Sequence, residues 1–277
     1  MTLSVRNNFF KGGIVIASLS LGLVVLAGYI AYPAFPEAAS SSAMRSQGII
    51  QSLIKGFVGP STYIPFWAIL CAVLYSLVSI ILIYYYFEKT QSPEILFIGF
   101  FVLSLAFEFA RIAIPVKLIL SFPAEYLATA SRVLLFGRHF GVFSLFAASV
   151  YAAGLDTQNQ HNIFTVLVLA ALVIALNVPI DSLVWDSTFM LWNGYGSMFH
   201  IVETGILIVA IATFFISAYT KDSKNYVIIG IGAFLMIVGR NILINSDTLI
   251  VLLPGAAILV MGTWFVCDRL HKEYLWL

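Results

Sequence analysis

The chain has 277 residues, of which 61% are hydrophobic and only 10% are charged, and its formal net charge is +1. Soluble domains carry about 25% charged residues, so this composition is typical of a membrane protein. A nearly neutral chain lacks the basic surface that nucleic acid requires, and its two cysteines stand in apolar runs without a CxxC or Cys/His cluster. We therefore predict no nucleic-acid partner, no disulfide framework, no metal site and no cofactor.

The first apolar run covers residues 13–32 and is long enough to cross a bilayer once. Two interpretations are open, because the following residues 33–43 are rich in small side chains, as after a secretory signal peptide. The run is long for the core of a signal peptide, so we favour an uncleaved N-terminal anchor over residues 1–32.

A hydrophilic interval, residues 33–60, follows the first run and is predicted to lie outside the cytoplasm. Within it, Ile50, Leu53, Ile54 and Phe57 fall on one helical face. The pattern predicts a short amphipathic helix near 44–58, which lies in the membrane interface or packs on the bundle.

Further apolar runs, joined mostly by short loops, occupy the rest of the chain. They lie at 63–87, 95–122, 127–151, 163–180, 196–219, 226–244 and 249–267. We therefore predict an all-α, polytopic transmembrane bundle of eight spans, in which residues 61–277 form a seven-helix membrane domain. Small residues allow helices in a membrane to approach closely. Glycines predict such contacts for the last two spans: Gly230, Gly232, Gly239, Gly255 and Gly262.

The distribution of basic residues predicts the orientation, because cytoplasmic loops carry an excess of lysine and arginine. The side of the N-terminus holds Arg6, Lys11, Lys89, Lys221, Lys224, Arg269 and Lys272, and the other side holds Arg45, Lys55 and Lys117. This asymmetry predicts a multi-pass protein of a bacterial-type inner (plasma) membrane with both termini in the cytoplasm. The outer loop 181–195 has two tryptophans and no basic residue, so we expect an aromatic lid at the interface.

Ionisable residues inside the apolar runs mark the candidate site, because a charge in a membrane is costly unless it is paired or faces water. Glu108 and Arg111 are three residues apart and share one helix face. At about 1.5 Å of rise per residue, charged groups of four spans reach one layer roughly 6–11 Å below the outer boundary. The predicted polar site consists of Glu108, Arg111, Arg132, Arg138, His200, Glu203 and Arg240.

The layer holds more arginines than carboxylates, which favours an anionic ligand or lipid head group as the compensating partner. We expect Glu108 to pair with Arg111 or with an arginine of another span, and Glu203 to pair with Arg132 or Arg240. The surplus arginines would face a cavity below the lid. Two alternatives use the same residues: a small-anion or metabolite transporter, and a structural subunit in which the charges only fix helix packing.

Several activities are disfavoured because the residues that they require do not occur in the sequence. No lysine stands in the late spans for a retinal Schiff base, and neither HExxH nor GxSxG occurs. This favours a non-enzymatic role without catalytic residues. One anchor, an exposed segment and seven helices resemble bacterial seven-helix sensory membrane domains in topology, which implies a sensory role. Because only residues 268–277 follow the last span, we expect a partner membrane protein to receive the signal.

Overall fold

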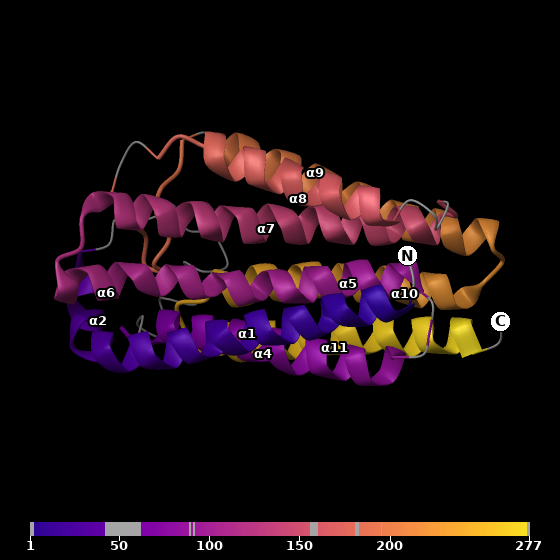
Figure 1. Cartoon of the computed structure of the whole chain (residues 1–277), viewed down its shortest axis with the longest axis horizontal. Helices are drawn as coiled ribbons and strands as arrows, with labels where there is room; N and C mark the ends of the chain where they lie inside the picture. The colour runs from indigo at the N-terminus through magenta and orange to yellow at the C-terminus, as the bar shows by residue number, and fades with distance from the viewer. Residues whose placement is uncertain are drawn as a thin grey trace.

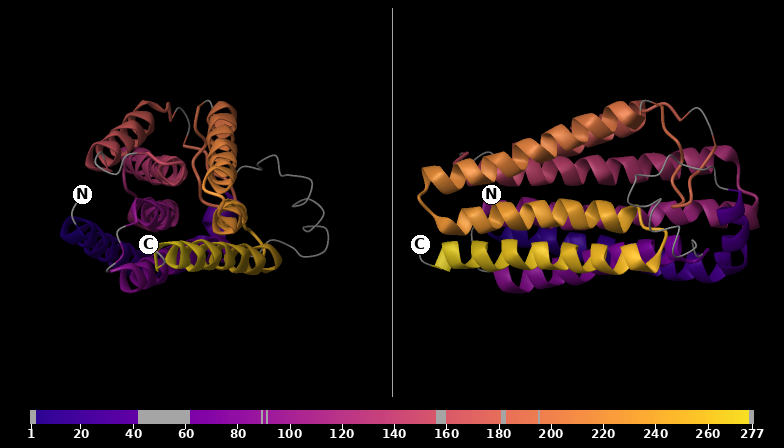
Figure 2. Two further views of the ribbon diagram at one scale, coloured as in Figure 1. Left: turned by 90° about the vertical axis from the view of Figure 1, so that its right-hand side faces the viewer. Right: turned by 180° about the vertical axis from the view of Figure 1, so that it is seen from behind.

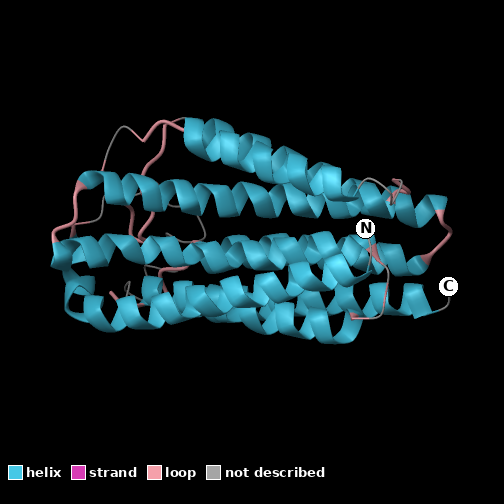
Figure 3. Cartoon of the chain, in the orientation of Figure 1, coloured by secondary structure: helices cyan, strands magenta, loops and turns pink. Residues whose placement is uncertain are grey.

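The computed structural model describes residues 3–41, 62–88, 90, 92–155, 160–180, 183–194 and 196–275. These residues form an elongated helical bundle with both termini at one end (Figure 1). Helices make up most of the described chain (Figure 3). Eight helical segments of the described chain are long and apolar enough to cross a membrane, and one isolated β-bridge joins Trp185 to Leu191. The prediction of an all-α bundle of eight spans is confirmed. The amphipathic helix predicted near 44–58 falls outside the described residues.

Most spans begin and end within three residues of the predicted boundaries. The first extends from Leu3 to Ser40, beyond the predicted 13–32, and the last ends at Leu275 and not at 267, because these helices continue past the apolar core of their spans. The first consists of α1 (Leu3–Ala31), η1 (Tyr32–Ala34) and α2 (Phe35–Ser40). The third consists of α5 (Pro93–Ser104), η2 (Leu105–Ile112) and α6 (Ala113–Leu120). The others are α4 (Ile64–Phe87), α7 (Ala124–Ala152), α8 (Gln160–Asn177), α9 (Gly196–Thr220), α10 (Lys224–Ile244) and α11 (Leu249–Leu275).

The third span lies at the centre of the bundle. Its most apolar stretch is 89% buried by the rest of the protein, whereas that of α8 is only 11% buried. The third span packs against α1, α4 and α7, and α8 packs on the outside of α7. Polar groups on the third span are therefore surrounded by protein, because neighbouring helices separate them from lipid.

The middle of this central span is a 3₁₀ helix, η2, which continues for eight residues. Runs of more than three or four residues are uncommon in 3₁₀ helices, because their hydrogen bonds are poorly aligned. A 3₁₀ helix has about three residues per turn, so side chains three positions apart eclipse each other. Glu108 and Arg111 consequently lie one above the other on the same line of η2.

Two glycines of α7 bring its backbone against the central span. A Cβ atom on Gly137 would lie 2.3 Å from Cβ of Phe107, and one on Gly141 would lie 2.3 Å from Oγ of Ser104. Any side chain at these positions would push the helices apart. The four-residue spacing of the two glycines is the usual device for close packing between membrane helices.

The last two spans also meet through glycines, as predicted. Cβ atoms added to Gly232, Gly239, Gly255 and Gly262 would each lie within 3.0 Å of atoms of the facing helix, α10 or α11. Gly230 differs, because its nearest neighbours are Phe214 and Phe215 of α9. Four of the five predicted contacts are thus confirmed, and the fifth belongs to another helix pair.

Candidate functional site

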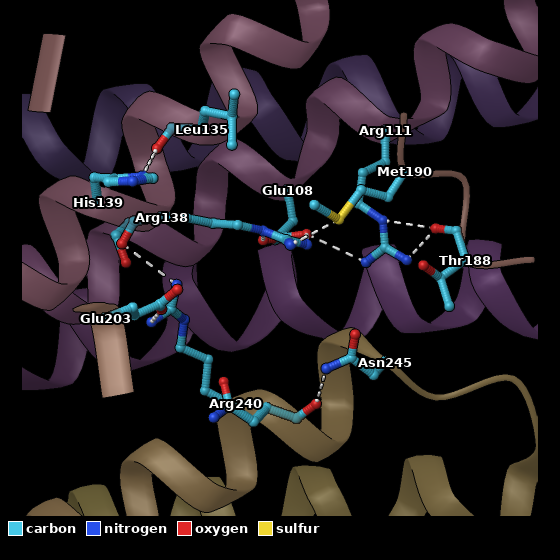
Figure 4. A network of polar contacts seen from close by, with 12 residues as sticks. Glu108, Arg111, Leu135, Arg138, His139, Thr188, Met190, Glu203, Arg240 and Asn245 are labelled. Carbon is cyan, nitrogen blue, oxygen red and sulfur yellow. Dashed lines mark hydrogen bonds and ion pairs between the residues drawn. The ribbon is translucent and has the colours of Figure 1, made fainter. Parts of the chain in front are cut away.

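Glu108 is the centre of a buried ionic network (Figure 4). Arg138 of α7 donates to it through two nitrogens on one edge of its guanidinium, with Nε 2.9 Å from Oε1 and Nη2 3.0 Å from Oε2. Nη1 of Arg111 lies 3.2 Å from Oε2 of the same carboxylate. The carboxylate therefore holds two helices together, and its pairing with Arg111 and with an arginine of another span agrees with our prediction.

A second ion pair joins the network from α9 and α10. Nη1 of Arg240 lies 3.3 Å from Oε1 of Glu203, and its Nη2 donates to the carbonyl of Arg138 at 3.4 Å. The guanidinium carbon also lies 5.8 Å from the ring centre of Phe101. Of the two partners predicted for Glu203, the structure selects Arg240. The network thus connects four spans.

The loop between α8 and α9 descends into the bundle and completes the network. Arg111 donates to the carbonyl of Thr188 through Nε, at 2.8 Å, and through Nη2. Nη1 of Arg138 lies 3.0 Å from the sulfur of Met190. The lid predicted at the interface is therefore a plug, which we define as residues 183–194. The loop enters the bundle because a buried guanidinium needs more hydrogen-bond acceptors than one carboxylate provides.

The plug is held in shape by its own buried carboxylate. Asp186 accepts hydrogen bonds from the backbone and hydroxyl of Thr188, at 2.9 and 2.7 Å, and from the backbone of Met190, at 3.1 Å. Phe189 has a φ of 58°, which is unfavourable for a bulky side chain, and it is buried against Phe35 of α2. The indole of Trp185 donates to the carbonyl of Ala38 at 3.0 Å. The plug is therefore held by the network arginines on one side and by Phe35 and Ala38 of the first span on the other.

Two of the predicted site residues lie outside the network. Arg132 and His200 are exposed, and neither makes a hydrogen bond or ion pair with the network residues of the described chain. Arg132 precedes Arg138 by six positions, which places it about 240° away around the helix. Depth alone therefore does not bring it to the site. The five that meet are Glu108, Arg111, Arg138, Glu203 and Arg240.

The predicted surplus of positive charge is absent from this arrangement. Without Arg132, three arginines remain, which pair with Glu108 and Glu203, and Asp186 of the plug is close enough to Arg111 and Arg138 to interact with them electrostatically. A cavity beside Arg111 is lined by Ser131 and Phe189, among others, and has a volume of about 10 Å³. That is room for about one water molecule. This cavity below the lid therefore has no room for anything larger than water.

Sequence reasoning missed part of this site. Gly137 and Gly141 carry a signal, since small residues spaced by four positions predict close helix packing. They set the distance at which Arg138 reaches Glu108. The plug residues Thr188 and Met190 carry no such signal, because one contributes a backbone carbonyl and the other a thioether sulfur, neither of which depends on a recognisable pattern.

A second candidate site is an apolar groove of about 490 Å³ between α1, the central span, α7 and α8. In the end-on view of Figure 2, α1 and α8 lie on the same side of the bundle, with α5 and α7 further in. Val5 and Ile16 on its α1 wall remain 43% and 42% exposed, so the groove is open to the surroundings of the bundle. We call this site the aromatic groove.

A continuous series of phenylalanine rings forms the floor of the aromatic groove. Phe9 contacts Phe164 at 4.8 Å between ring centres, and Phe164 contacts Phe100 at 4.9 Å. The series continues through Phe140, Phe136 and Phe107 with separations of 5.6, 5.7 and 5.4 Å. Such contacts stabilise the rings against one another, which makes the floor rigid.

Comparisons with known proteins do not identify a relative: no family model, no curated protein and no solved structure matches the chain. The functional conclusion therefore depends on the geometry of the two candidate sites.

Proposed function

We propose that this protein is a non-enzymatic, lipid-binding membrane component, and that the aromatic groove holds the apolar chain of its ligand. The observation that carries the proposal is the floor of six phenylalanine rings, which connects four spans. Moving a chain from lipid into a groove gains no hydrophobic free energy, so affinity has to come from close packing. A rigid aromatic surface provides that packing at a low entropic cost.

The length of the groove supports a ligand from one leaflet. Its α1 wall runs from Val5 to Ile16, which corresponds to about 16 Å of helix. This is about half of a 30 Å hydrocarbon core. The groove therefore matches the depth of a single acyl or isoprenoid chain.

The buried ionic network has a different role in this proposal. Its charges are matched and its neighbouring cavity has a volume of only about 10 Å³. We propose that Glu108 and its partners fix the packing of α7, α9 and α10 on the central span and hold the plug in place. This favours the structural alternative for the polar layer. A small-anion transporter would need arginines that face water, and reconstituted vesicles would reveal it by anion uptake.

We also propose an orientation and a context. The excess of basic residues at the end with both termini supports a cytoplasmic location for that end in a bacterial-type inner membrane. A sensory role would require a partner membrane protein. Helix α8, of which only 11% of the most apolar stretch is buried, offers a surface for one.

Two glycines of α1 allow a matched test. Gly12 lines the aromatic groove and Gly22 does not, and a Cβ on either would meet no atom within 4 Å. Both changes to leucine are therefore compatible with the fold, and both raise helix propensity. We expect Gly12→Leu to obstruct the groove and Gly22→Leu to leave it open.

The assay is photo-crosslinking of the purified protein with a phospholipid that carries a diazirine on one acyl chain. Peptides that contain Phe9 or Phe164 should be labelled in the wild type and in Gly22→Leu, and several-fold less in Gly12→Leu. Equal labelling of these peptides in all three proteins would refute the proposal, because the groove would then not select a chain.

A further inference from the structure

A second groove, between α4 and α11, combines apolar walls with a polar end. It has a volume of about 200 Å³, and its walls include Leu82, Ile83 and Val260. Asp268 and His271 line the same groove near the end of α11. A pocket with this distribution fits an amphiphile whose chain lies between the helices and whose head lies at the polar end. We call it the α4/α11 groove.

The polar end lies at the depth of lipid head groups. It is level with the last turn of α4, since Phe87 ends that helix and also lines the groove. Tyr86 and Trp264 beside it are 58% and 67% exposed. Tyrosine and tryptophan concentrate at the boundary between hydrocarbon and water. This end therefore faces the head groups of the leaflet on the side of both termini.

An unsatisfied nitrogen stands at this end. Nδ1 of His271 is buried and makes no hydrogen bond within the described chain, and the ring lies edge-on to Phe87 with 5.6 Å between ring centres. A buried polar atom without a partner costs about 1–3 kcal/mol. An oxygen of a bound molecule that accepts a hydrogen bond from a protonated Nδ1 would remove that cost.

The charges around His271 favour an anion. Nζ of Lys272 lies 2.8 Å and Nε of Arg269 lies 3.4 Å from the same oxygen of Asp268. Two cations thus share one carboxylate, and both are partly exposed. The remaining positive charge, together with an imidazole nitrogen, is suited to a phosphate group.

We propose that the α4/α11 groove binds an anionic phospholipid from the leaflet on the side of the termini. One acyl chain lies between α4 and α11, and the phosphate contacts His271, Arg269 and Lys272. Selectivity comes from the head group, because the chain gains little on leaving the bilayer. This site is separate from the aromatic groove, which lies against α1 and α8, so either proposal can fail without the other.

The test uses the full-length protein, stripped of lipid in detergent and titrated with phosphatidylglycerol or phosphatidylcholine in native mass spectrometry. We expect the wild type to retain phosphatidylglycerol several-fold better than phosphatidylcholine. Lys272→Gln and His271→Phe should each lose most of that preference. The second change keeps an aromatic ring against Phe87 and removes the nitrogen.

Lys224→Gln is the matched control. Lys224 is exposed in the first turn of α10 at the same end of the bundle, and its removal lowers the total charge by the same amount as Lys272→Gln. The Lys224→Gln variant should show the same lipid preference as the wild type. Equal retention of both lipids by the wild type, or equal losses in Lys224→Gln and Lys272→Gln, would overturn the proposal, since the protein would then bind lipid only as a general cationic surface.

Discussion

Replacing Glu108 by glutamine tests the role of the ionic network most directly. The change keeps the size of the side chain and removes the charge that two buried arginines share. Glu203→Gln is the natural comparison, because Glu203 has a single partner at 3.3 Å and remains 27% exposed. If the network fixes the bundle, Glu108→Gln should destabilise the protein much more than Glu203→Gln.

The hydrogen bonds of the two carboxylates determine the expected difference in stability between the variants. Glu108 accepts three hydrogen bonds, from Arg111 and from two nitrogens of Arg138. Intramembrane hydrogen bonds average about 0.6 kcal/mol each, which gives a lower limit of about 2 kcal/mol for three. Breaking a buried ion pair in soluble proteins costs about 3–5 kcal/mol, which gives the upper limit. Glu203 accepts one hydrogen bond, from the buried Arg240, and a glutamine oxygen can still accept it, so this change should cost about 1 kcal/mol.

The assay is thermal unfolding of the purified protein in detergent, with Glu125→Gln as a control because Glu125 is exposed at the start of α7. At about 2–4 °C per kcal/mol, Tm should fall by about 4–20 °C for Glu108→Gln and by no more than about 4 °C for Glu203→Gln. Should the two variants melt at the same temperature, Glu108 does not hold the bundle together, and the structural role of the network is refuted.

Three further predictions concern packing, the plug and topology. Gly137→Ala should cost about 1–3 kcal/mol of stability through overpacking, whereas Gly205→Ala, where a Cβ meets nothing within 4 Å, should cost none in the same melting assay. Asp186→Ala removes the acceptor of three hydrogen bonds, so deuterium exchange in residues 183–194 should accelerate while that of α10 stays unchanged. A cysteine at Ser46 should react with an impermeant reagent only from outside intact cells and one at Lys221 only from inside; reaction of both from one side would contradict the proposed orientation.

The fold could be predicted from the sequence because membrane spans are defined by properties that can be read along the chain. Length and polarity locate each span, and the eight segments of the described chain agree with those predicted. The same reasoning placed Glu108 beside arginines, since depth along a helix follows from residue number. Depth does not give the direction around the helix, which is why Arg132 was assigned to the network and lies outside it.

The plug could not be predicted for a different reason. Its main contact joins Arg111 to the carbonyl of a residue 77 positions away. Neither periodicity nor hydropathy indicates which backbone carbonyl accepts a hydrogen bond from an arginine far away in the sequence. The charge balance depended on this contact, because the plug also brings Asp186 towards Arg111 and Arg138. The arrangement thus differs from the predicted surplus of arginines because of a tertiary contact and not because of a misplaced span.

The 3₁₀ conformation of η2 also determines how this span tolerates changes in length. Eight residues of 3₁₀ helix advance about 16 Å and turn about 960°, whereas eight residues of α-helix advance about 12 Å and turn about 800°. Ten α-helical residues advance about 15 Å and turn about 1,000°, which nearly reproduces the observed step. Inserting two residues into η2 therefore leaves α5 and α6 in almost the same relative position once the segment relaxes to an α-helix. With one inserted residue, nine α-helical residues advance about 13.5 Å and turn about 900°, which is about 2.5 Å and 60° short of the observed step, so a two-residue insertion should be tolerated better than a single one.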